Sequence, residues 1–179
     1  MGKILFKPVF FILLFIIAFS LFLPMKNLYY LFENTLYSKY KIVVSNEILQ
    51  DKIYSLDIQK GLLYQGNELK GSIENINFTY YLFYNKLSIT NMKLDNKLTY
   101  LPVAPIKIDT LQLEYSIKEP LYIPIIARGD FGSLKAKVDL LNRNIEFILK
   151  PSSKMRTKGS RVLHKMKSTK GVYSYVYKY

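Results

Sequence analysis

The sequence contains no cysteine, no tryptophan and a single histidine. Without cysteine the chain forms no disulfide, no thiolate metal site and no cysteine nucleophile. His164 alone cannot build a multi-histidine metal site, and no acid lies near it in sequence to orient it as a general base. No two of the 13 acidic residues stand in a context that indicates a cooperating pair. We therefore expect a protein that is not an enzyme and that uses no cofactor or metal.

Acidic residues are absent from the last thirty positions of the chain. Residues 150–179 hold nine of the 26 lysines and arginines and no aspartate or glutamate, whereas residues 1–149 hold 17 basic and 13 acidic residues. The net charge of +13 therefore belongs mostly to the C-terminal segment. Residues 1–149 thus carry nearly equal numbers of basic and acidic side chains, whereas residues 150–179 are strongly basic. This distribution indicates a local function for the C-terminal segment, not a general attraction of the whole protein to polyanions.

Hydrophobic residues make up 50% of the chain, which excludes a disordered, solvating polypeptide. Residues 4–25 are interrupted only by Lys7 and Ser20. As a helix they would span about 33 Å, enough for a hydrocarbon core of about 30 Å. A cleaved signal peptide is the alternative, but residues 18–24 lack the small-residue pattern of a cleavage site. We expect residues 1–25 to be a transmembrane anchor, with a cytoplasmic N-terminus favoured by Lys3 and Lys7.

Residues 26–41 are predicted to form a membrane-proximal helix. Apolar residues recur there at three- and four-residue spacing, as on one face of a helix: Leu28, Leu31, Phe32, Leu36 and Tyr40. Tyr29, Tyr30 and Tyr37 suit the membrane interface, where a tyrosine keeps its ring dry and its hydroxyl solvated. An ordinary helix that caps the following domain is the alternative.

Residues 42–179 show the two-residue period of β-strands with one buried face. The alternating segments are 54–58, 76–84, 111–117, 134–140 and 145–149. Turn residues separate them, and the short gaps favour antiparallel hairpins: Gly61, Gly66, Gly71, Asn85 with Lys86, Asp95 with Asn96, Gly129 with Asp130, and Asn142 to Asn144. We expect a mainly β fold, in which a curved antiparallel sheet forms a groove, sandwich or half-barrel with a short helix at each end.

In one predicted strand the apolar residues change from even-numbered to odd-numbered positions, which we call a change of parity. Ile106 and Ile108 alternate out of phase with Leu111 and the residues after it. Either a bulge near Asp109 and Thr110 reverses the two faces, or the strand breaks there.

The C-terminal segment combines a helix signal with a final strand. Ser160 is a candidate N-cap, and Gly171 can end the turn that follows. Residues 172–179 alternate tyrosines with other residues, and we expect this strand to fold back onto the sheet. The candidate contact residues of the basic segment are Lys154, Arg156, Lys158, Arg161, Lys165, Lys167 and Lys170. They can form a solvated helix face, bind anionic lipid or an acidic protein, or bind nucleic acid together with the tyrosines.

The order of these parts resembles the type II secretion system protein N family, which is itself similar to AsmA-like periplasmic proteins. The resemblance depends on the N-terminal anchor, Pro24, and the segments SLDIQKGLLYQG at 55–66, LKGSI at 69–73, GDFGSL at 129–134 and LKPS at 149–152. It implies a protein anchored in the bacterial inner membrane by a single span, with a periplasmic β domain at 42–179 and no catalytic residues.

Two functional hypotheses follow from this resemblance and from the apolar sheet face. The first is a non-enzymatic accessory component of a type II secretion or pilus-type assembly system, with other proteins of that machine as partners. The second is an AsmA-like groove that binds or transfers lipid. A component of a DNA-uptake machine is a further alternative.

Overall fold

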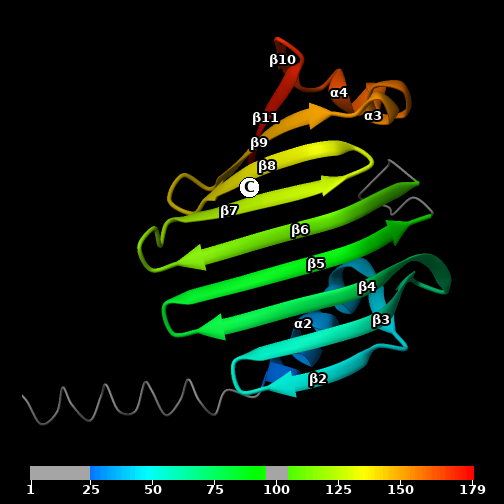
Figure 1. Ribbon diagram of the computed structural model, residues 1–179, viewed down its shortest axis with the longest axis vertical. Coiled ribbons are helices and arrows are strands. Elements are labelled where there is room, and N and C mark those ends of the chain that lie inside the picture. Colours follow the sequence, from blue (N-terminus) through cyan, green and yellow to red (C-terminus); the bar gives the residue numbers. More distant parts are fainter. Residues whose placement is uncertain (1–24, 96–104) are drawn as a thin grey trace, which may run out of the picture.

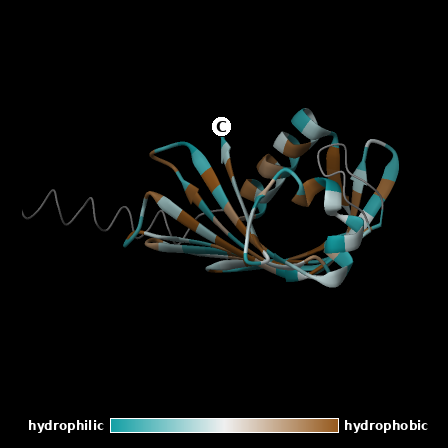
Figure 2. Cartoon of the chain, turned by 90° about the horizontal axis from the view of Figure 1, so that it is seen from above, coloured by the Kyte–Doolittle hydropathy of each residue, from teal (hydrophilic) through white to brown (hydrophobic). Residues whose placement is uncertain are grey.

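The computed structural model describes residues 25–95 and 105–179. They form one antiparallel sheet of 11 strands (Figure 1), which curls into an open trough (Figure 2). The strand order is β1-β3-β4-β5-β6-β7-β8-β9-β11-β10, and β2 pairs with β3 beside β1. The strands are β1 (Ile42–Ser45), β2 (Ile48–Lys52), β3 (Ser55–Gln65), β4 (Glu68–Tyr81), β5 (Tyr84–Leu94), β6 (Ile106–Ser116), β7 (Tyr122–Gly129), β8 (Gly132–Asp139), β9 (Asn144–Pro151), β10 (Lys167–Thr169) and β11 (Val172–Lys178).

The described helices are α2 (Met25–Tyr40), α3 (Ser153–Lys158) and α4 (Ser160–Leu163), and they lie on the concave side of the sheet (Figure 2). The prediction of a mainly β fold is therefore confirmed, and the sheet is an open one. None of these three helices has both the length and the apolarity needed to cross a bilayer. The predicted anchor lies outside the described residues except for Met25, so it stays a prediction.

The two faces of the sheet differ in polarity because its strands alternate along their length. Outward-facing residues of adjacent strands form polar rows, such as Asp57 opposite Asn77 and Ser88 opposite Gln112. Lys86 and Glu114 also face outward and form an ion pair of 3.0 Å. The apolar residues between these positions point into the trough, where they form three clusters.

The predicted parity change in β6 is confirmed. The pairing of β6 with β7 shifts register between Ile108 and Thr110, at the position where the sequence indicated a bulge. Ile106 and Ile108 before the shift, and Leu111 after it, all line the same inner cavity. The extra residue therefore keeps apolar side chains on the concave face along the whole strand.

Strands β3 and β5, on either side of β4, also change parity at this level, a feature that the sequence analysis did not predict. Ile89 and Met92 are three residues apart in β5, yet both pack against the same buried cluster. Asn91 between them has φ of 50°, and Lys60 of β3 has φ of 59°. In each strand, one residue in the left-handed backbone conformation forms a bulge, and this extra residue shifts the alternation by one position.

The turns of the sheet differ in part from the prediction. The segment 76–84 is not one strand, because β4 ends at Tyr81 and β5 begins at Tyr84. The turn lies at residues 82–83, and Asn85 and Lys86, the predicted turn residues, are inside β5. Gly61 is also inside a strand, where a Cβ atom would come within 2.6 Å of Val44 Cγ1. Glycine is needed there for close packing and not for a turn.

Helix α2 covers one end of the concave face. Met25 is buried against Leu56 and Ile58 of β3, and Tyr29 packs against the same cluster. Leu31 and Phe32 of the same helix remain more than 60% exposed. The helix therefore caps the sheet, as one of the two sequence interpretations expected, and it also keeps exposed apolar residues.

A pair of carboxylates lies between α2 and the first two strands. Burial, and secondly the charge of Glu47, raise the pKa of Glu33 above its usual range. The Tyr29 hydroxyl donates a 3.4 Å hydrogen bond to Glu47 Oε1, and burial raises the pKa of Tyr29 as well. The Val44 amide donates a 3.3 Å hydrogen bond to Glu33 Oε1. The charged form of Glu33 is therefore less favourable in the folded protein than in the unfolded chain.

We expect Glu33→Gln to raise the free energy of unfolding at neutral pH. A raised carboxyl pKa destabilises the folded state above that pKa, and the penalty disappears as the pH falls below the pKa of the unfolded chain. The glutamine keeps an oxygen that can accept the bond from Val44. Urea unfolding near pH ~7 and near pH ~4 should give a difference from the wild type that shrinks on acidification. Glu119→Gln, at an exposed glutamate, is the control and should show no such trend. An equal effect of Glu33→Gln at both pH values would contradict the assignment.

The C-terminal segment covers the other end of the concave face. Ser152 caps α3 by accepting a bond from the Met155 amide, so the helical segment begins earlier than the predicted cap at Ser160. Met155 and Leu163 are buried against Leu149 of β9. The prediction that the final strand folds back is confirmed, and β11 joins the sheet as an antiparallel neighbour of β9.

Candidate functional site

The middle of the concave face lacks a cover of described residues. Helix α2 contacts β1, β2 and β3, and α3 contacts β9. Between these ends, inward-facing Ile89, Leu111 and Ile125 are only half-buried. Apolar side chains that remain accessible inside a curved sheet form a surface suited to an apolar ligand.

An apolar cavity lies on this face, between β6–β9, β11 and the two C-terminal helices. We call it the groove, and its volume is about 540 Å³. Ala127 is only 2% exposed and contributes little side-chain volume. Because the Ala127 side chain is small, the larger side chains around it enclose an empty space, which is the groove. The groove is lined by Ile106, Ile108, Leu111, Ala127, Phe131, Leu134, Phe147, Leu149, Met155, Val162, Lys165, Met166, Tyr175 and Tyr177.

Lys165 is the one charged residue among the described residues that line the groove. It belongs to the turn after α4 and is exposed, so it contributes a positive charge beside the cavity. Tyr175 and Tyr177 of β11 line the same cavity. An apolar interior with a polar mouth is the usual arrangement of a site for an amphiphilic molecule.

A second, polar depression adjoins the groove, and we call it the basic pocket. Its volume is about 360 Å³, and it shares Met166 with the groove. Arg156 of α3 and His164, which follows α4, line it together with the hydroxyl-bearing residues Ser160, Ser168 and Tyr173. Guanidinium, imidazole and hydroxyl groups are the donors that recognise phosphate oxygens.

The cations of this region are largely unneutralised. Lys154 forms an ion pair with Asp130 at the turn between β7 and β8. The remaining predicted contact residues form no ion pair with an acid among the described residues: Arg156, Lys158, Arg161, Lys165, Lys167 and Lys170. Their positive charge is therefore available to an anionic ligand.

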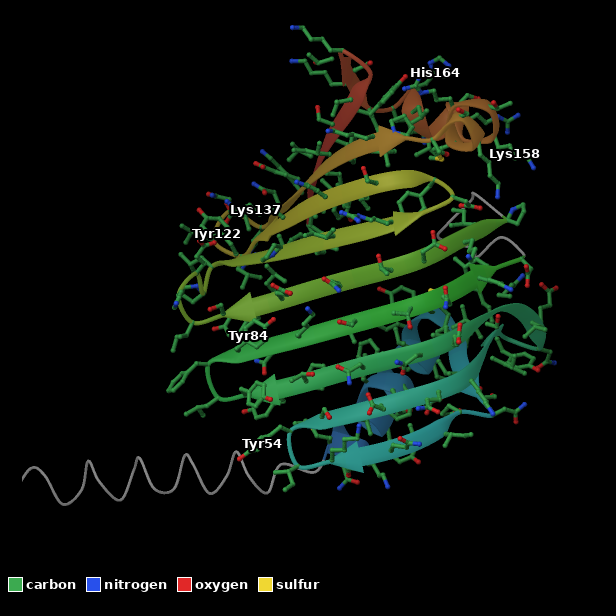
Figure 3. The ribbon with its side chains drawn as sticks, viewed as in Figure 1. Tyr54, Tyr84, Tyr122, Lys137, Lys158 and His164 are labelled. Carbon is green, nitrogen blue, oxygen red and sulfur yellow. The ribbon has the colours of Figure 1, made fainter. Side chains whose placement is uncertain are left out.

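The structure separates the predicted basic residues into two groups. Arg156 and Lys165 lie at the two cavities, whereas Lys158 and Arg161 line neither. Figure 3 shows Lys158 and His164 at the end of the trough formed by the C-terminal helices. Among the predicted interface tyrosines, Tyr30 and Tyr37 are exposed on α2, whereas Tyr29 is half-buried.

Sequence reasoning identified Lys165 but missed the apolar residues that line the groove. Ala127 lines the groove, Ala136 is a second inward-facing small residue on the adjacent strand, and both are buried. An alanine at an inward position between larger apolar residues is a sequence signal for a hollow, but its meaning depends on the register between β7 and β8.

A third depression lies at the level of the parity changes. Its lining includes a row of outward-facing residues across β3–β6, Leu62, Ser72, Lys93 and Lys107. Lys107 is paired with Asp109 at 2.8 Å, and the Glu74 carboxylate accepts a 2.6 Å hydrogen bond from Asn91. Three of its polar side chains, Lys107, Glu74 and Asn91, therefore already have partners, so it is a weaker candidate site.

No three metal-ligating side chains converge within residues 25–95 and 105–179. Comparisons with protein-family models, with curated proteins and with solved structures find no match. The resemblance to the type II secretion system protein N family therefore stays a prediction from the sequence.

Proposed function

We propose that this protein binds a phosphorylated lipid, with an acyl chain in the groove and the phosphate in the basic pocket. The observation that carries the proposal is that Met166 lines both cavities, so that they lie side by side. An apolar cavity beside a cluster of phosphate donors matches the two halves of a phospholipid.

The two halves of the ligand would contribute by different physical effects. Each methylene moved from water into the groove contributes about 0.8 kcal/mol. Arg156 can donate two parallel hydrogen bonds to phosphate oxygens, and Lys165 adds a charge at the mouth. Acyl burial supplies most of the affinity, and the basic pocket supplies the preference for an anionic headgroup.

The proposed location follows the sequence expectations. Residues 1–25 anchor the chain in the bacterial inner membrane, and the trough lies on the periplasmic side. A role as an accessory component of a secretion, pilus-type or DNA-uptake machine depends on the sequence resemblance alone. A lipid-binding trough is the hypothesis that the groove favours.

The proposal is tested by native mass spectrometry of the protein extracted in mild detergent. We expect co-purified phospholipid, with anionic species enriched over their share of the membrane extract. Arg156→Gln should reduce that enrichment several-fold, because the guanidinium in the pocket is lost. Lys158→Gln removes the same charge outside the pocket and is the matched control.

Equal effects of these two substitutions would indicate general attraction to the basic segment and would contradict a phosphate pocket. Repeatedly lipid-free protein would contradict the proposed function as a whole.

A further inference from the structure

Four consecutive hairpin turns on one long rim of the trough carry exposed apolar side chains. The turns lie at residues 53–54, 82–83, 117–121 and 140–143, and they follow one another along one side of the sheet in Figure 1. Ile53 is 68% exposed, Phe83 56% and Leu141 69%. Ile117, Leu121 and Leu140 are also exposed. We call these six side chains the apolar rim.

Such residues are unusual in tight turns. Glycine, proline, asparagine, aspartate and serine dominate turns because their backbone and hydrogen-bonding properties suit them. Isolated exposed apolar residues need no explanation, but a repeated apolar feature on one side of a protein marks an interaction surface.

The opposite rim provides an internal comparison. Its turn between β3 and β4 is formed by Gly66 and Asn67, both exposed. Its turn between β7 and β8 contains Asp130 and Phe131, and Phe131 packs inward against the cluster around Leu149. The described turns of the two rims therefore differ in polarity, although both belong to the same meander.

The chain enters the fold at the apolar rim. Met25 is buried against Leu56, two residues after Tyr54 in the first of the four turns. The sequence before Met25 is almost entirely apolar from Ile4 onward. An apolar segment long enough to span a bilayer thus joins the domain beside the row of apolar turns.

Tyrosines accompany the apolar rim. Figure 3 shows Tyr54, Tyr84 and Tyr122 along this side of the sheet. The rings of Tyr54 and Tyr81 are 5.4 Å apart, and the Lys137 ammonium lies 3.6 Å from the centre of the Tyr122 ring. Tyrosine beside lysine is the combination that membrane–water interfaces favour.

We propose that the apolar rim inserts into the interfacial region of a phospholipid bilayer, so that the trough stands with this rim on the membrane. Successive turns are separated by two strands, which places them about 10 Å apart. Such a row of separate tips offers little continuous area for a protein interface of about 800 Å² per partner. Each tip can enter a fluid bilayer independently, and the adjoining apolar segment favours a bilayer as the occupant.

The charges in these turns are mixed. Lys118 and Glu119 are adjacent in one turn, and Arg143 follows Leu141 in another. Insertion should therefore depend on apolar burial and resist salt, unlike binding at the basic pocket. The proposal does not depend on a lipid in the groove.

The absence of cysteine from the chain allows a clean labelling experiment. Single cysteines are introduced as Phe83→Cys or Leu141→Cys on the apolar rim, and as Asn67→Cys or Leu69→Cys on the opposite rim. Each full-length variant carries an environment-sensitive fluorophore and is placed in phosphatidylcholine nanodiscs at one copy per disc. Brominated lipids then measure contact between the label and the acyl region.

We expect blue-shifted emission and several-fold stronger quenching at Phe83 and Leu141 than at Asn67 and Leu69, unchanged by high salt. Leu69 is 46% exposed, so its label controls for an apolar position outside the rim. Adding Ile53→Ser, Phe83→Ser and Ile117→Ser to the Leu141-labelled chain should lower its quenching at least severalfold.

Equal quenching of all four labels would overturn the proposal. A blue shift of the rim labels that appears only with two copies per disc would also overturn the proposal. It would show that the apolar rim makes contact between copies of the chain. Phospholipid recovered with the extracted protein reports on the groove separately, so the two proposals can fail independently.

Discussion

Ala127→Phe should empty the groove of lipid while the sheet stays folded. Ala127 is at the bottom of the groove, and a phenylalanine side chain would project into the space that we assign to an acyl chain. The ring can occupy the existing cavity, so the substitution fills space instead of forcing apart a closed core. We expect the lipid recovered with the protein to fall at least about tenfold, which corresponds to a loss of about 1.4 kcal/mol in binding. Native mass spectrometry and the melting temperature measure the two parts of this prediction.

Ile126→Phe is the matched control for this experiment. Ile126 is the preceding residue of β7, points to the outer face and is 44% exposed. It should retain bound lipid and the wild-type melting temperature. Loss of lipid in both variants would indicate a general disturbance of β7, and retained lipid in Ala127→Phe would place the ligand elsewhere.

The sheet could be predicted because its strands expose one face and bury the other. Alternation at residues 111–117, 134–140 and 145–149 lies within β6, β8 and β9, apart from Ile117 and Leu140, each of which is one residue beyond the end of its strand. The parity change around Asp109 was visible for the same reason, since a reversed alternation in one apolar stretch requires an extra residue. The tyrosine alternation after Gly171 likewise predicted β11.

The apolar turns misled the same reasoning. Leu82 and Tyr84 continue the alternation of β4, so the sequence favoured a longer strand and placed the turn at Asn85 and Lys86. The structure turns at residues 82–83, so that Tyr81 pairs with Tyr84 of β5, and Tyr84 in turn pairs with Ser116 of β6. A turn made of apolar residues has no local sequence signal, and only the pairing of distant strands determines it.

The candidate site depends on contacts between segments that are distant in sequence. The basic residues were identified individually, but their division between cavity-lining Arg156 and remote Lys158 depends on how α3 packs on β9. The groove depends on the space between Ala127 and the C-terminal helices. Periodicity gives the face on which a residue lies, but it gives no information on what lies above that face.

Truncation after Lys170 should destabilise the whole domain. Residues 171–179 include β11, which pairs with β9 from Leu149 to Asn144. The truncation would expose the backbone edge of β9 and remove Tyr173 from the cluster of Leu149, Met155 and Leu163. Losing part of the burial of several such side chains costs on the order of 3 kcal/mol. For a domain of this size we expect the melting temperature to fall by roughly 10 °C.

Two point variants keep this prediction testable if the truncated chain does not fold. Tyr173→Ala preserves the backbone of β11 but removes a side chain from the cluster, and should cost about 1–3 kcal/mol. Val176→Ala changes a residue of the same strand that is 53% exposed, and should be nearly neutral. Chemical unfolding of the full chain distinguishes them.

If a protease removed residues 171–179 from the native protein without lowering its melting temperature, β11 would not be part of the cooperative fold, and the basic segment would have to act as a free arm. Because β11 also supplies Tyr175 and Tyr177 to the groove, a docked strand links the stability of the sheet edge to the integrity of the proposed lipid site.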